Sequence, residues 1–147
     1  MCSSDLVALH GVIDRIDHVR DPMSSEGGAA LQLIDYQTGS ASAQRDKVRV
    51  PFEDPQLEFY AALVRAESAQ SLSAMYLALD GNTGIEEVPH KGVAESADAL
   101  VQGLAHDLQR LRAGAGLPAL GEGRTCEFCE ARGVCRRDHW SPAEAAP

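Results

Sequence analysis

The first third of the chain alternates apolar and polar residues in the way that is typical of β-strands. This pattern predicts a strand over residues 6–19 and a second strand over residues 30–36. We expect a bulge or bend at Gly11, because a glycine inside a strand often marks such a site. Residues 21–28 are rich in turn-forming residues, so the two strands are expected to form an antiparallel hairpin.

The middle of the chain predicts a loop followed by a helix. Residues 38–47 are small and polar and are expected to form a mobile loop. A helix is expected to open at Asp54-Pro55, because proline fits the first turn of a helix. Apolar residues then recur at helical spacing, namely Leu57, Tyr60, Ala61 and Val64.

The second half predicts two more strands and a long helix. The strands are expected over residues 71–79 and 85–88, and the helix over residues 94–112, ended by Gly114-Ala115-Gly116. One apolar stripe follows the helix, formed by Ala97, Leu100, Val101, Leu104, Leu108 and Leu111. The order of these elements predicts an α/β (α+β) domain with a small central mixed sheet flanked by helices.

The composition is that of an ordinary globular domain. The chain has 147 residues, of which 44% are hydrophobic and 24% are charged. No apolar run approaches the roughly 20 residues that span a bilayer, and the N-terminus lacks a secretory signal. A cytoplasmic protein without membrane contact is therefore expected. The net charge of −9 disfavours tight non-specific binding to nucleic acid but suits binding of hard cations by carboxylates.

Two of the predicted strands each present a carboxylate near one end. Asp35 and Gln37 are two residues apart and point to the same face of an extended strand, and Asp14 has a similar place in the first strand. These two carboxylates, with the backbone carbonyl of Tyr36, would provide oxygen ligands for Mg²⁺ or Mn²⁺ and leave positions for water. The alternative is a structural role, because strands commonly end in aspartate at turns.

Three of the four cysteines, Cys126, Cys129 and Cys135, lie close together near the C-terminus, and the fourth is Cys2. In a cytosolic protein such clustering favours a metal or iron–sulfur site over disulfides. A zinc site with His139 or Cys2 as the fourth ligand is one alternative. Three unligated thiols are the other.

Four motifs occur in an order that resembles a known nuclease family. Residues 11–17 read GVIDRID, residues 35–39 read DYQTG, residues 56–60 read QLEFY, and the cysteines follow as Cys126-x2-Cys129-x5-Cys135. In these motifs the chain closely resembles the RecB-like family of PD-(D/E)XK nucleases, and within it the C-terminal nuclease domain of AddB-type helicase–nucleases. The motifs cover nearly the whole chain.

The resemblance implies a restriction-endonuclease-like core that hydrolyses DNA phosphodiesters with metal-activated water. It implies metal-ligand roles for Asp14 and Asp35, and it places Gln56 and Tyr60 on a helix that lines the site. The family has a lysine two residues after the second acid, where this chain has Gln37. The cysteines resemble three of the four thiolate ligands of a [4Fe–4S] cluster.

Gln37 leads to two hypotheses about activity. An amide brings no positive charge to the reacting phosphate, and losing one such preorganised donor costs on the order of 10²–10³ in rate. Lys47 or Arg45 on the adjoining loop would be the substitutes. The first hypothesis is a metal-dependent DNA nuclease domain of a repair or recombination helicase–nuclease, catalytically impaired by Gln37. The alternative is a non-catalytic DNA-binding or scaffolding domain that supports a helicase or nuclease partner subunit.

The expected division of the chain follows from the same resemblance. Residues 1–120 would form the nuclease-like core, residues 121–140 the cysteine-rich segment and residues 141–147 a tail. The family carries a helix and a cluster cysteine upstream of this region, which implies a C-terminal fragment of a longer protein. The iron–sulfur cluster would then be complete only in the full-length protein. An uncovered edge strand would also allow a homodimer of the fragment.

Overall fold

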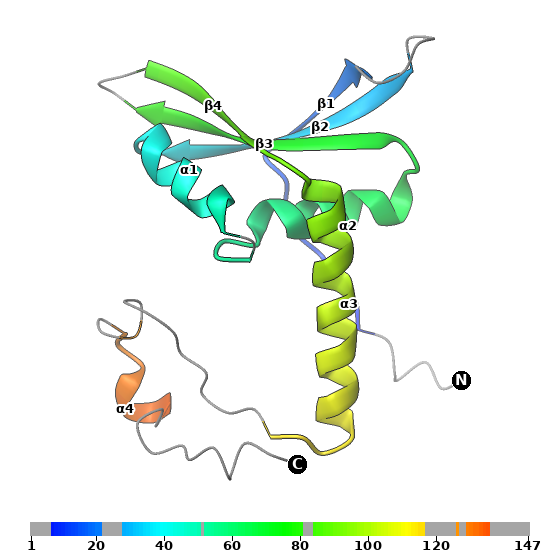
Figure 1. Cartoon of the computed structure of the whole chain (residues 1–147), viewed down its shortest axis with the longest axis vertical. Coiled ribbons are helices and arrows are strands. Elements are labelled where there is room, and N and C mark those ends of the chain that lie inside the picture. Colours follow the sequence, from blue (N-terminus) through cyan, green and yellow to red (C-terminus); the bar gives the residue numbers. More distant parts are fainter. Residues whose placement is uncertain are drawn as a thin grey trace. The chain divides into compact units, whose positions relative to one another are not determined.

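A computed structural model describes residues 7–21, 28–50, 52–80, 84–116, 126 and 129–135. Four strands form one sheet in the order β1-β2-β3-β4 (Figure 1). They are β1 (Arg15–Arg20), β2 (Ala29–Thr38), β3 (Ser71–Asp80) and β4 (Gly84–His90). The central pair, β2 and β3, is parallel, whereas β1 and β4 run antiparallel to their neighbours. The sheet is mixed and its first two strands are antiparallel, as the sequence predicts.

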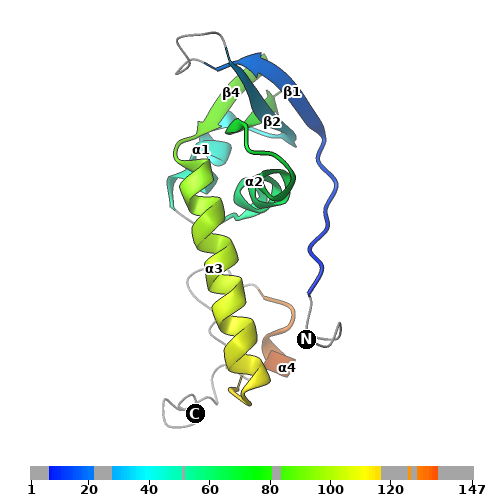
Figure 2. The same ribbon diagram turned by 90° about the vertical axis from the view of Figure 1, so that its right-hand side faces the viewer.

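Two helices connect the parallel strands across one face of the sheet. They are α1 (Ala41–Arg49) and α2 (Gln56–Glu67), and both lie on the same side of the sheet (Figures 1 and 2). A parallel pair requires such a crossover, because the chain has to return to the end of the sheet where the first strand began before the next strand can start. A long helix, α3 (Val93–Arg112), follows β4, and the short α4 (Arg132–Cys135) lies in the cysteine segment.

The hydrophobic core lies between the sheet and these helices. Leu33 of β2 and Tyr76 of β3 are fully buried on the covered face, and Leu57 and Ala61 of α2 pack against them with no exposed surface. The predicted apolar face of α2 is therefore confirmed, with Tyr60 and Val64 packed at its margin. This packing holds α2 in a fixed position over the middle of the sheet.

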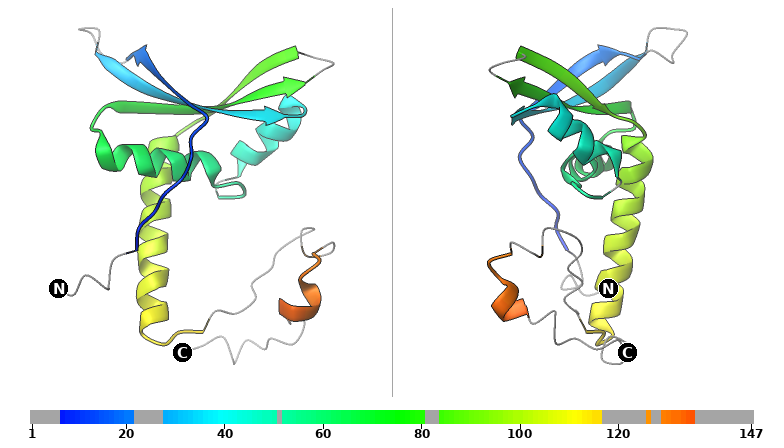
Figure 3. Two further views of the ribbon diagram at one scale, coloured as in Figure 1. Left: turned by 180° about the vertical axis from the view of Figure 1, so that it is seen from behind. Right: turned by 60° about the vertical axis from the view of Figure 1, so that its left-hand side comes forward.

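The first strand is shorter than the pattern predicts. Pairing with β2 starts only at Arg15, opposite Ile34, and residues 7–14 are not part of the sheet. These residues run past α2 instead (Figure 3). A Cβ at Gly11 would lie 3.1 Å from Leu63 Cδ1 on that helix. Gly11 is thus not a bulge within a strand but a point of close approach between the chain and α2.

The prediction of a mobile loop over residues 38–47 is wrong, because α1 occupies most of this stretch. The hydroxyl of Ser40 caps the helix by accepting a hydrogen bond from the backbone N–H of Ala43 at 3.3 Å. Serine is favoured at this position because it satisfies a backbone donor that the first helical turn leaves unpaired. The small residues that suggested a loop are a cap and the first turn, and Ala41 is buried against the core.

The predicted bounds of α3 are confirmed, but most of its predicted apolar stripe is not buried. The helix ends at a Schellman motif, in which Gly114 adopts a φ of 90° and the N–H of Ala115 donates to the carbonyl of Arg110 at 3.0 Å. Val101 and Leu104, predicted to belong to an apolar stripe, are about two-fifths exposed. Of the helix residues, only Val93 and Ala97 are buried.

The described residues fall into two compact units, one ending at Gln102 and one beginning at Gly103. The predicted domain boundaries near residues 120 and 140 stay predictions, because residues 117–125 and 136–147 lie outside the described ranges. Among the described helices, none is long and apolar enough to cross a membrane.

Candidate active site at the end of strand β2

The two predicted acidic ligands meet at the end of β2. Because β1 is antiparallel to β2, the residue that precedes β1 lies beside the last part of β2. Asp14 occupies that position, and its Oδ2 accepts a hydrogen bond from the backbone N–H of Tyr36 at 3.0 Å. Asp35 lies on the covered face of β2 and is only 3% exposed. The sheet register therefore brings together two acids that are 21 residues apart in the sequence.

Two side-chain amides hold the Asp35 carboxylate. Nε2 of Gln37 donates to Oδ2 at 2.5 Å, and Nε2 of Gln56 donates to Oδ1 at 2.9 Å. The Gln56 amide also donates to the hydroxyl of Tyr60, one helical turn further along α2, at 3.2 Å. The structure thus places Gln37, Gln56 and Tyr60 with Asp35 in one cluster. Spacing predicts only the two pairs, and the resemblance implies that the helix pair lines the site.

A lysine from α1 completes this cluster. Nζ of Lys47 donates to Oε1 of Gln37 at 3.3 Å and forms an ion pair with Asp54 Oδ2 at 3.0 Å. The ammonium also lies 5.3 Å from the centre of the Tyr76 ring, within the range of a cation–π interaction. Of the two predicted substitutes for the missing lysine, Lys47 lies at the site, whereas Arg45 pairs with Glu86 on β4.

Two members of the cluster carried no recognised signal in the sequence. Asp54 was expected only to open α2. Its carboxylate forms an ion pair with Lys47 and also accepts a hydrogen bond from the hydroxyl of Tyr76 at 3.2 Å. Tyr76 stands beside Asp35 in the parallel register of β2 and β3. No local pattern predicts that register, because it depends on the path of the chain through α1 and α2.

Burial dominates the electrostatics of Asp35. It raises the pKa of the Asp35 carboxyl above its ordinary value, because the charged form loses solvation. The carboxylates of Asp14 and Asp54 raise that pKa further, whereas the hydrogen bond from Gln37 and the charge of Lys47 oppose the rise. Burial beside Asp54 likewise raises the pKa of Tyr76, so its phenol stays protonated and donates.

The donor atoms at this site fit a hard divalent cation. Asp14 and Asp35 repel each other enough to affect the pKa of Asp35, and a cation between them would remove that repulsion. Among the described residues, no group of three or more histidine, cysteine or acidic side chains could hold a metal. The two carboxylates would therefore be completed by neutral oxygens, such as the Tyr36 carbonyl, and by water. Mg²⁺ accepts such a shell, since it binds through one or two carboxylates and keeps several waters.

The cysteine segment is not arranged as a ligand cluster in the part of the chain that the structure describes. Cys126 is half-buried, and Cys129 and Cys135 are exposed. Among the described residues, these cysteines do not belong to a group of three or more metal-binding side chains. Cys2 and His139, the proposed fourth ligands, lie outside the described residues. The iron–sulfur site and its zinc alternative stay predictions.

Comparison with protein families gives one match, which covers almost the whole chain. The model of the PD-(D/E)XK nuclease superfamily matches residues 2–136, and this range includes the whole acidic cluster and the three clustered cysteines. The small mixed sheet with its helices agrees with the restriction-endonuclease-like α/β fold predicted from the sequence. No curated protein matches the chain.

Proposed function

Since this chain belongs to the PD-(D/E)XK nuclease superfamily, we propose that it hydrolyses phosphodiester bonds of DNA with a bound Mg²⁺ or Mn²⁺ ion. Asp14, Asp35 and the carbonyl of Tyr36 would hold the ion. When bound, such an ion activates water and offsets negative charge on the phosphate. The remaining residues of the cluster would orient the carboxylates and supply further positive charge.

The position of Lys47 is the observation that carries the proposal. The amide of Gln37 bridges two charges, since its Nε2 faces Asp35 and its Oε1 faces the Lys47 ammonium. A cation therefore lies one side chain away from the position where the superfamily motif has its lysine. α1 positions Lys47 firmly, because Asp54 and the Tyr76 ring contact the same ammonium.

This arrangement matches what phosphodiester hydrolysis requires of a protein. Negative charge grows on the phosphate as water attacks, and a preorganised cation in a partly buried site stabilises that charge more than it would in water. Lys47 has about one third of its side chain exposed, so it is shielded from solvent but still accessible to a phosphate. Gln56 and Tyr60 hold Asp35 in place from α2.

Cleavage of labelled single- and double-stranded DNA in Mg²⁺ and in Mn²⁺ tests the proposal. We expect cleavage by the native chain and by Asp98→Ala, a control that removes an exposed carboxylate on α3 away from the cluster. Asp35→Ala should abolish it. Cleavage that persists in Asp35→Ala at the native rate would show that this cluster is not the active site.

One observation favours the non-catalytic alternative. Both oxygens of Asp35 already accept hydrogen bonds from side-chain amides, so the protein's own groups satisfy the carboxylate. In that case the domain would bind DNA or support a partner subunit without cleaving. Gln37→Lys separates the two functions. Cleavage that appears only in this variant would mean that Gln37 impairs an otherwise complete site, whereas DNA binding without cleavage by native chain and variant would favour the scaffold.

We extend the proposal to the biological setting that the sequence motifs suggest. Their order supports a RecB-like nuclease domain, close to the AddB type, within a longer helicase–nuclease of DNA repair or recombination. Cys126, Cys129 and Cys135 would then contribute to a [4Fe–4S] cluster in the full-length protein. Purification of the full-length protein with its partner subunit, followed by an absorption spectrum and iron analysis, tests this extension.

A further inference from the structure

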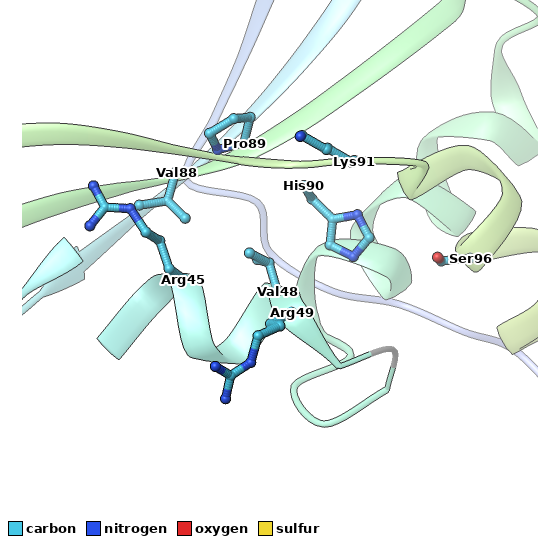
Figure 4. A pocket seen from close by; sticks show the side chains of 8 residues that line it. All are labelled: Arg45, Val48, Arg49, Val88, Pro89, His90, Lys91 and Ser96. Atoms are coloured by element: carbon cyan, nitrogen blue, oxygen red, sulfur yellow. The ribbon is translucent and has the colours of Figure 1, made fainter. Parts of the chain in front are cut away.

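A second polar site lies beside α1, away from the acidic cluster. It is a pocket of about 620 Å³ between α1, the end of β4 and the start of α3, and Figure 4 shows it from close by. Its lining residues are Arg45, Val48, Arg49, Val88, Pro89, His90, Lys91 and Ser96. Arg45, Val48 and Arg49 share one face of α1, as residues three and four apart do. Lys47, which contacts the acidic cluster, leaves the helix in another direction.

The His90 ring carries a buried nitrogen without a hydrogen-bond partner among the described residues. The side chain of His90 is 6% exposed, and its Nε2 lies 3.1 Å from Oε1 of the buried Glu58. The other ring nitrogen, Nδ1, is buried with no hydrogen-bond partner among the described residues. Buried polar atoms are nearly always paired. The ring faces the pocket between Val48 and Ser96 (Figure 4), so a bound group is the missing partner that the geometry offers.

The charges around His90 determine which kind of group fits. Arg45 pairs with Glu86, and Arg49 pairs with Asp46 at 3.3 Å, but all four side chains are well exposed. Exposed ion pairs contribute little free energy, so both guanidinium groups can turn to a stronger anion.

The other donors around the pocket come from Lys91, from the start of α3 and from His90 itself. The first turn of α3, which includes Ser96, contributes the positive end of a helix dipole. Nε2 of His90 faces Glu58, so Nδ1, which has no partner among the described residues, is the ring atom that would contact the anion.

We propose that this pocket binds a phosphate group. The proposal rests on the proposed nuclease function for the source of that group, the DNA backbone, although a free phosphate ion has the same chemistry. α1 would then contact DNA from two faces, with Lys47 near the reacting phosphate and Arg45 and Arg49 on a neighbouring one. Two fixed phosphate contacts would set how the strand lies across the end of β2.

Salt-dependent DNA binding tests the backbone as the source. The affinity of the native chain for a single-stranded oligonucleotide is measured by fluorescence anisotropy in EDTA, which excludes metal-dependent cleavage. Arg45→Gln/Arg49→Gln is compared with Arg20→Gln/Arg65→Gln, which removes the same charge from exposed arginines outside the pocket. The logarithm of the affinity falls as the logarithm of the salt concentration rises, and losing one phosphate contact makes this slope less steep by about 0.7. We expect this change, with affinity about tenfold weaker, in the pocket variant only.

An NMR titration of the His90 imidazole tests whether the pocket itself binds phosphate. The ¹⁵N resonances of the His90 ring are followed by NMR while inorganic phosphate is added to the native chain and to Arg45→Gln/Arg49→Gln. A saturable shift of Nδ1 in the native chain, weakened in the variant, together with the change in slope, supports a DNA phosphate in the pocket. The shift without any change in slope also supports a phosphate pocket and identifies free phosphate as its source. Absence of the shift overturns the proposal, whether or not the slope changes.

Neither measurement requires DNA cleavage. A chain that binds phosphate in the pocket but cleaves nothing would therefore contradict the proposed nuclease activity alone. Conversely, a chain that cleaves DNA without the His90 shift would contradict only the phosphate pocket.

Discussion

The end of β2 and the cysteine segment were both predicted from motifs, yet only the first forms a cluster in the described structure. Asp35 and Gln56 are 21 residues apart and are joined by a hydrogen bond. Cys126, Cys129 and Cys135 lie within ten residues, and the described part of their segment holds only the four-residue helix α4. At the end of β2, the sheet register and a packed helix fix side chains across long separations in the sequence.

The largest effect should come from removing the packing that holds α2 in place. Leu57→Ala creates a cavity in the core, where Leu57 is completely buried, and should cost about 2–5 kcal/mol in the free energy of unfolding. The matched control is Val134→Ala in the cysteine segment, where the valine is 83% exposed, and it should cost less than about 0.5 kcal/mol. Urea denaturation followed by circular dichroism measures both. Equal losses in the two variants would contradict the contrast between the regions.

The next effect concerns the charge that α1 brings to the site. Lys47→Gln should lower the rate constant for cleavage at saturating DNA by roughly 10²–10³, because a preorganised cation is lost. Arg20→Gln, which removes an exposed cation on β1, should leave that rate constant unchanged. The swap Gln37→Lys/Lys47→Gln returns the charge to the strand and should restore most of the rate. Failure of Lys47→Gln to slow cleavage would remove Lys47 from the site.

The residues that sequence reasoning identified follow local periodicities. Asp35 and Gln37 share a face because strand side chains alternate, and Gln56 and Tyr60 share a face because they are four apart on a helix. Asp14 was found because the second strand returns along the first. These relations predict which residues share a face of one element. That Gln56 and Tyr60 belong with Asp35 was implied only by the resemblance of the motifs to the nuclease family.

Three features of the site were not predictable in this way. Lys47 was named as a possible substitute for the missing lysine, but the helix that carries it was missed. Small polar residues after β2 suggested a loop, although Ser40 is a good helix cap. Tyr76 joined the cluster only through the parallel register of β2 and β3, which is set by the whole crossover. Asp54 joined it through its contacts with Tyr76 and Lys47. The first strand was predicted too long because residues 7–14 alternate like a strand but contact α2.

A smaller effect tests the repulsion between the two acids. Asp14→Asn keeps an oxygen acceptor for the Tyr36 N–H but removes the negative charge that helps to raise the pKa of Asp35. The pKa of Asp35 should fall, as measured by ¹³C NMR of its carboxyl carbon. In EDTA the variant should be more stable than the native chain by about 0.5–1 kcal/mol. Mn²⁺ should raise the melting temperature of the native chain and not that of the variant.

The size of this stability difference depends on pH. A raised pKa means that the folded state binds the Asp35 proton more tightly than the unfolded chain does, so this group's contribution to stability falls as pH rises through the raised value. The advantage of Asp14→Asn should therefore be present above that pKa and disappear below it, where Asp35 is neutral. An advantage that grows on acidification would contradict repulsion as its cause.

The smallest effect is expected in the cysteine segment. Cys129→Ser replaces an exposed thiol with a group of similar size, and without a bound metal it should change neither the melting temperature nor DNA cleavage. A metal ion or cluster would reverse this expectation, because binding free energies of structural metals reach about 10 kcal/mol and appear as folding stability. A fall of several degrees in melting temperature, accompanied by loss of bound iron or zinc in elemental analysis, would show that the thiols form a site after all. The cysteine motif would then be as good a guide as the strands, and the contrast between the two regions would disappear.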